Sequence, residues 1–160
     1  MFVQRFHTNH RGFTLVELVV VVLILGILAA VAYPKVVSRT DDSELTTIRL
    51  SLRTIQDQID LQYALTGSYP ATINPAWFRG NKIPHHPLNG GAIPDVHVFS
   101  GHDRTHPSHK TLDNYGAYWY NRDVGIVRAR VPYSSSSAEV IAKYNLFNDS
   151  ALTSLGQMYD

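Results

Sequence analysis

The chain contains one uninterrupted apolar segment that constrains its fold more than any other feature. Residues 13–33 read FTLVELVVVVLILGILAAVAY and carry a single charge, at Glu17. As an α-helix these 21 residues span about 31 Å, which matches the hydrocarbon core of a bilayer. A lone strand would leave its backbone hydrogen bonds unmade in lipid. The segment therefore predicts a helix that lies in a membrane at some stage of the protein's life.

Glu17 lies near the start of this apolar segment, where a carboxylate without a partner is costly. The cost is about 2–3 kcal/mol or more, depending on the depth in the bilayer. The segment contains no lysine or arginine that could neutralise the charge. We therefore expect Glu17 to have a function and to take a cationic partner from outside the segment.

The residues on both sides of Glu17 carry a family resemblance. A short basic leader, residues 1–12, contains no acid and ends at Gly12. The sequence GFTLVEL follows, then the apolar segment, then Pro34. This order resembles the N-terminus of type IV pilins and of type II secretion pseudopilins, and the match runs from Arg11 to Pro34.

The resemblance implies that a membrane-embedded prepilin peptidase cuts between Gly12 and Phe13 and then methylates the new amine of Phe13. It also implies that this amine is the missing cation, because Glu17 of one subunit would neutralise Phe13 of its neighbour in a filament. Either group alone would stay charged in apolar surroundings, so the pair would set the register between subunits. Residues 13–34 would then form the helix of the membrane and of the filament core. The implied partners are a filament of identical or related pilins, an inner-membrane assembly platform, and lipid before assembly.

Two other interpretations of the apolar segment stay open. Ala30-Val31-Ala32 is an acceptable site for an ordinary signal peptidase, which would release a soluble periplasmic protein after Ala32. However, the segment exceeds the roughly 7–15 apolar residues of a signal peptide, and a carboxylate inside one is unexpected. A plain single-pass anchor is the other interpretation, and the basic residues on the two sides of the segment orient it only weakly.

Residues 35–67 predict an amphipathic spine helix. Apolar residues recur there at spacings of three and four, at Leu45, Ile48, Leu52, Ile55 and Ile59. Because strand patterns follow, we expect this stripe to pack on a sheet, with a coiled-coil seam between monomers as the alternative. The helix either continues through a kink at Pro34 or starts anew at the capping pair Asp41 and Glu44. Gly67 predicts its end.

Residues 68–160 predict a small globular head. Three strand patterns are present, at residues 96–99, 116–121 and 126–131. They predict an antiparallel sheet whose last two strands form a hairpin, with Arg128 and Arg130 facing water. A short helix after Ser136 and a weakly structured C-terminal tail complete the head. The predicted fold class is α+β and pilin-like: a long N-terminal helix, with a membrane half and an amphipathic half, packed on a small antiparallel sheet.

The head contains six of the eight histidines, between His85 and His109. His102, His106 and His109 approach the spacing of metal ligands, but Pro107 prevents a shared helical face. We expect solvated loop histidines and keep these three as weak metal candidates. The resemblance implies that a loop of the head can bind calcium. The acids there show no EF-hand pattern, so no ligands are assigned; they are Asp95, Asp103, Asp113 and Asp123.

The chain shows no catalytic motif and no cysteine, so we expect neither an enzyme nor a cofactor. With 14 basic and 13 acidic residues, it has no basic excess for binding nucleic acid. The predicted function is a structural subunit of a type IV pilus-like filament, more specifically a pseudopilin of a type II secretion-like system. A surface type IV pilin for adhesion, motility or DNA uptake is the alternative, and the absence of cysteine favours the pseudopilin.

The predicted location follows from this function. We expect a single-pass protein of the bacterial inner membrane with its head in the periplasm, and then a periplasmic or extracellular filament.

Overall fold

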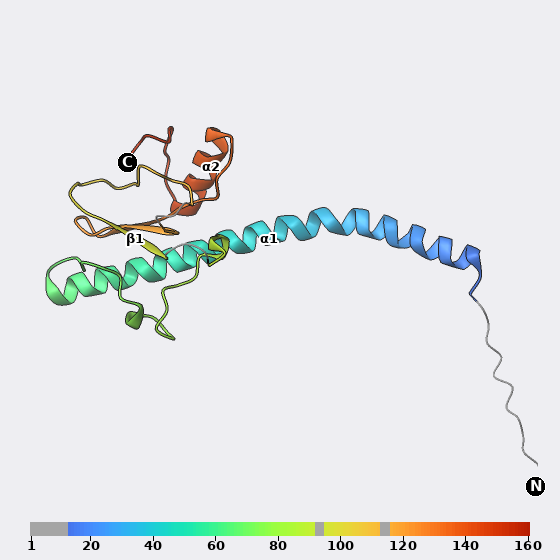
Figure 1. Cartoon of the computed structure of the whole chain (residues 1–160), viewed down its shortest axis with the longest axis horizontal. Coiled ribbons are helices and arrows are strands. Elements are labelled where there is room, and N and C mark those ends of the chain that lie inside the picture. Colours follow the sequence, from blue (N-terminus) through green and yellow to red (C-terminus); the bar gives the residue numbers. More distant parts are fainter. Residues whose placement is uncertain (1–12, 92–94, 113–115) are drawn as a thin grey trace, which may run out of the picture. The chain divides into compact units, whose positions relative to one another are not determined.

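The computed structural model describes residues 13–91, 95–112 and 116–160, without the side chains of residues 31–41. Its elements in chain order are α1 (Leu15–Thr66), 3-10 turns at Pro75–Trp77 and Pro87–Asn89, β1 (Val96–Phe99), β2 (Tyr118–Asn121), β3 (Ile126–Ala129) and α2 (Ser137–Asn148) (Figure 1). They belong to two compact units, Met1–Thr40 and Asp41–Asp160. The leader with Gly12, and Asp113, lie outside the described residues.

Helix α1 continues through Pro34, so the spine region does not start a new helix at Asp41. The kink predicted at Pro34 falls among the residues whose side chains are not described, and it stays a prediction. The helix ends where Gly67 was expected to end it. Gly67 has a φ of 75°, and its N–H donates to the carbonyl of Tyr63 at 2.8 Å.

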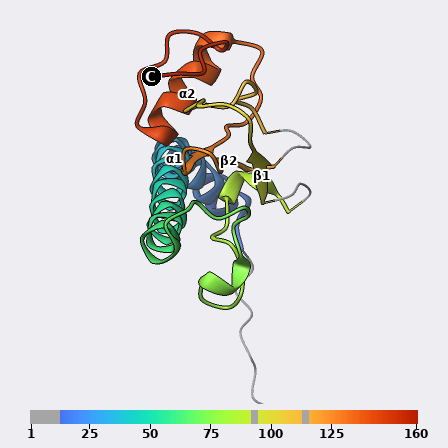
Figure 2. The same cartoon turned by 90° about the vertical axis from the view of Figure 1, so that its left-hand side faces the viewer.

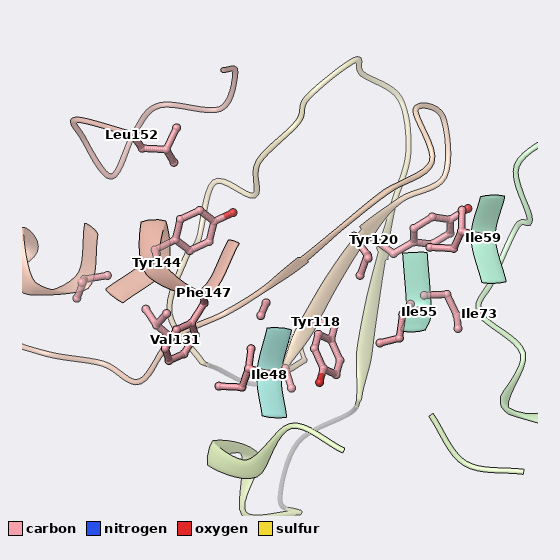
Figure 3. Packing of buried hydrophobic residues seen from close by; sticks show 14 of the residues in the cluster. Ile48, Ile55, Ile59, Ile73, Tyr118, Tyr120, Val131, Tyr144, Phe147 and Leu152 are labelled. Atoms are coloured by element: carbon pink, nitrogen blue, oxygen red, sulfur yellow. The ribbon is translucent and has the colours of Figure 1, made fainter. Parts of the chain in front are cut away.

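The second part of α1 forms one wall of the core of the head. Ile48, Ile55 and Ile59 are fully buried, and Leu45 and Leu52 pack against the same cluster. Figure 3 shows the three isoleucines with Tyr118 and Tyr120 of β2. The predicted packing of the stripe on a sheet is therefore confirmed.

The sheet has the strand order β1-β2-β3. The predicted hairpin is confirmed, because β2 and β3 are antiparallel, with Tyr120 opposite Val127. However, β1 pairs with β2 in parallel, so the sheet is mixed rather than wholly antiparallel. The 18 residues between β1 and β2 are long enough for the crossover that parallel strands require.

The free edge of β3 is closed by two side-chain amides. Gln56 of α1 donates to the carbonyl of Gly125 at 2.7 Å and accepts from the N–H of Val127 at 3.1 Å. Asn148 of α2 makes the same pair of bonds with the backbone of Ala129, at 2.9 and 2.7 Å. An open strand edge invites pairing with another chain. The two amides provide hydrogen-bond partners for the backbone N–H and C=O groups of this edge. They also bind the sheet to both helices, which lie beside it in Figure 2.

The predicted orientation of the arginines on β3 and its extension is partly wrong. Val127, Ala129 and Val131 are buried as expected, but Arg130 is also buried, at 2% exposure. Its guanidinium donates to the carbonyls of His109 and Gly116, at 3.0 and 2.9 Å. Alternation along the strand could not reveal that these loops cover the second face of the sheet.

The hairpin turn provides a test of the packing. Gly125 has a φ of 71°, and a Cβ there would lie 2.1 Å from the ring of Tyr69. We expect Gly125→Ala to destabilise the head by roughly 2–4 kcal/mol, from backbone strain and overpacking. Denaturant unfolding of the full chain in detergent, followed by tryptophan fluorescence, measures the loss.

Gly101→Ala is the matched control for this substitution. Gly101 also has a positive φ, of 102°, but a Cβ there would meet no atom within 4 Å. Gly101→Ala should therefore lose only the part of the unfolding free energy that the backbone strain costs. Equal losses in the two variants would contradict the packing of Tyr69 against Gly125.

Candidate functional site

The first turn of α1 is held by Thr14. The Thr14 hydroxyl accepts from the N–H of Glu17 at 3.2 Å, and the Thr14 carbonyl accepts from the N–H of Leu18 at the same distance. Thr14 and Glu17 thus have the spacing of a capping box. A carboxylate in the first turn also interacts favourably with the helix dipole. Glu17 stands out in the sequence by its charge, whereas the role of Thr14 was not predicted, although the T-x-x-E spacing indicates it.

The helix that follows exposes its apolar side chains on all sides. Every residue from 13 to 30 is exposed, and Leu15 reaches 80%. None of the ion pairs among the described residues includes Glu17. A helix that is apolar all round requires a cover of lipid or of other helices. This surface, with one carboxylate at its start, is the candidate functional site.

Among the described residues, no helix combines the length and the apolar character that crossing a bilayer requires.

The cleavage site predicted at Gly12 and Phe13 is only half described. Phe13 is the first described residue and is 74% exposed, whereas Gly12 lies outside the described residues. Cleavage, methylation of Phe13 and the role of Glu17 in subunit register therefore stay predictions.

The histidines of the head have separate surroundings. His106 is fully buried, with Nδ1 3.0 Å from the Tyr144 hydroxyl and Nε2 2.7 Å from a carboxylate oxygen of Asp160. Burial lowers the pKa of His106, and the hydrogen bond to Asp160 opposes this shift. His102 stacks on Phe99, and His109 lies 3.2 Å from the Ser108 hydroxyl. The part of the chain that the structure describes contains no group of three acids or histidines placed to hold a metal ion.

The described acids of the head do not fit a calcium site either. Asp123 accepts from the backbone N–H of Gly101, and Asp103 accepts from the hydroxyl of Tyr159 at 3.3 Å. Calcium takes about 6–8 oxygen ligands, usually with several carboxylates. These carboxylates have other partners and form no such group among the described residues.

Arg122, Arg128 and Arg130 are the arginines of the hairpin and its extension, where a pilin that takes up DNA would need a basic patch, and two of them bind backbone carbonyls of the head. Arg128 donates from Nε to the carbonyl of Thr105 at 3.2 Å and lies 3.8 Å from the carboxylate of Asp160. Arg130 is buried beneath the loops described above, and only Arg122 is well exposed.

Comparison with known proteins identifies the N-terminal part of the chain. Residues 7–33 match the family model "Prokaryotic N-terminal methylation motif". Over 64 residues, the chain is 43% identical to the type II secretion system core protein G of Pseudomonas aeruginosa, covering 40% of this chain and 45% of that protein. Over 85 residues, it is 39% identical to the type IV major pilin protein PilA of Myxococcus xanthus, covering 51% of this chain and 39% of that protein.

A core protein G of Klebsiella michiganensis is 30% identical over 64 residues, which are 40% of this chain and 45% of that protein. The matches thus span less than half the length of each of these relatives. No solved structure matches the chain significantly. The chain therefore carries a prokaryotic N-terminal methylation motif, and over its N-terminal part it is similar to a type IV pilin and to type II secretion pseudopilins.

Proposed function

We propose that this chain is a pseudopilin of a type II secretion-like system, built into a filament through the N-terminal part of α1. The observation that carries the proposal is the apolar surface of residues 15–30, which is exposed on all sides. In the inner membrane, lipid would cover this surface, with the head in the periplasm. In a filament, the same part of the helix from other subunits would cover it. Its apolar area thus remains away from water in both states, so transfer between them is energetically feasible.

Glu17 would make this packing specific. Apolar side chains alone allow helices to slide along one another, because dispersion contacts have little preference for register. Cleavage after Gly12 would place an amine at Phe13, four residues before the carboxylate. Pairing of Glu17 with Phe13 of a neighbouring subunit would neutralise both charges away from water. A shifted register would leave both groups unpaired, at a cost of about 3–5 kcal/mol.

A surface type IV pilin is the second candidate function. The similarity to the M. xanthus pilin favours it, since that match covers the larger share of this chain. The absence of cysteine favours the pseudopilin, because many type IV pilins close a C-terminal loop with a disulfide. The two functions differ in where the filament is found. Filaments in the fraction sheared from cells at native expression would indicate the pilin, and their confinement to the periplasm the pseudopilin.

Processing of the N-terminus gives the first test of this function. The mature protein should begin at Phe13 and carry one additional methyl group, which mass measurement of the intact protein can detect. The Gly12→Val variant should retain residues 1–12, because the bulky side chain blocks the cleavage site. A mature protein that begins at Tyr33 would instead establish an ordinary signal peptide and refute the proposal.

Substitution of Glu17 tests the filament register. We expect Glu17→Ala to leave the monomer in the membrane fraction and to reduce filament yield by at least about tenfold, since each 1.4 kcal/mol corresponds to a factor of ten. Asp57→Ala is the matched control, because Asp57 is an exposed acid on the same helix outside the apolar segment. Filaments at normal yield from the Glu17 variant would contradict the assigned role of this carboxylate.

A further inference from the structure

Lys110 is a buried lysine whose amino group is surrounded by backbone carbonyls. Only 3% of the residue is exposed. Its Nζ atom donates to the carbonyls of Pro107, Leu155 and Gln157, at 3.1, 2.8 and 2.7 Å. Nζ also lies 5.4 Å from the centre of the Tyr144 ring, within range of a cation–π interaction. An ammonium group has three N–H donors, so these carbonyls use all of them.

The three carbonyls come from segments far apart in the sequence. Pro107 belongs to the loop of residues 105–110, and the other two carbonyls belong to the tail of residues 150–160. Backbone bonds from Thr105 and His106 to the carbonyl of Met158 run beside them, at 3.0 and 3.1 Å. The carbonyl of Lys110 in turn accepts from the N–H of Val131, at 2.9 Å. Lys110 therefore connects the tail, through the loop, to the sheet.

The site contains a positive charge and, among the described residues, no carboxylate paired with Lys110. Burial lowers the pKa of Lys110 to about 8, so the side chain is predominantly an ammonium ion at neutral pH. Convergent backbone carbonyls are ligands that proteins commonly use for hard cations. In this head, three backbone carbonyls converge in this way on the ammonium group of Lys110.

We propose that the ammonium group of Lys110 is the built-in cation of a carbonyl-lined site that locks the tail onto the loop of residues 105–110, so that the head closes without calcium. This differs from the calcium binding that the family resemblance implies. Among the described residues, no three acids or histidines are placed to share a calcium ion, and the ammonium group of Lys110 already binds the three carbonyls around it. The inference concerns the head alone and does not depend on filament assembly.

The role of Lys110 can be tested on the purified full chain in detergent. Lys110→Met removes the amino group and keeps an unbranched apolar side chain of similar length, so the three carbonyls lose their donor. We expect chymotrypsin to cut the tail, at Leu152 or Leu155, at least about tenfold faster than in the unmodified chain. Lys143→Met is the matched control, since Lys143 is an exposed lysine that only pairs with Glu139 at 3.0 Å. It should leave cleavage unchanged.

Calcium dependence gives a second measurement that requires no variant. The melting temperature of the unmodified chain should stay the same with excess calcium chloride and with excess EDTA. A rise of several degrees in calcium chloride, or an equal fall in EDTA, would overturn the proposal even if Lys110→Met fails to fold. Tail cleavage in Lys110→Met at the rate of the Lys143 control would also overturn it.

Discussion

The structure depends on helix α1, which begins with an apolar segment that carries one carboxylate in its first turn. Residues 15–30 expose apolar side chains in every direction, and water cannot solvate such a surface without a large free-energy cost. The surface therefore requires a cover of lipid or of other helices. Both covers are apolar, and among residues 15–30 Glu17 is the one charged residue. In the proposed filament, pairing of this carboxylate with the amine of a neighbouring subunit would make the helix packing specific.

After residue 41, the apolar side chains of the same helix are buried in the core of the head, within the same chain. Ile48, Ile55 and Ile59 lie under a sheet of only three short strands. A sheet of this size has little stability of its own, so its edges and loops need further interactions to hold them in place. Polar side chains do this: Gln56 and Asn148 close one edge, and Lys110 fixes the tail. The head is thus stabilised by polar groups that find partners inside it, while the first part of α1 lacks such partners among the described residues.

Local patterns predicted much of this fold. The apolar segment, the stripe from Leu45 to Ile59 and the hairpin follow from periodicities of the chain, which the structure reproduces. Features that depend on contacts between distant segments could not be predicted. The parallel pairing of β1, the buried Arg130 and the carbonyls around Lys110 all depend on where the loops cross the sheet. At the candidate site, Glu17 was recognisable as a lone charge in an apolar segment, whereas the partner proposed for it would belong to another subunit.

Contact between that carboxylate and the amine of another subunit is the central claim, and zero-length cross-linking tests it most directly. Filaments would be assembled from a mixture of subunits with light and heavy nitrogen and treated with a carbodiimide, which joins a carboxylate to an amine only at contact distance. The account predicts a peptide in which Glu17 of one label is joined to the N-terminal Phe13 of the other. Filaments that yield no such mixed-label peptide, while other neighbouring pairs cross-link, would contradict it.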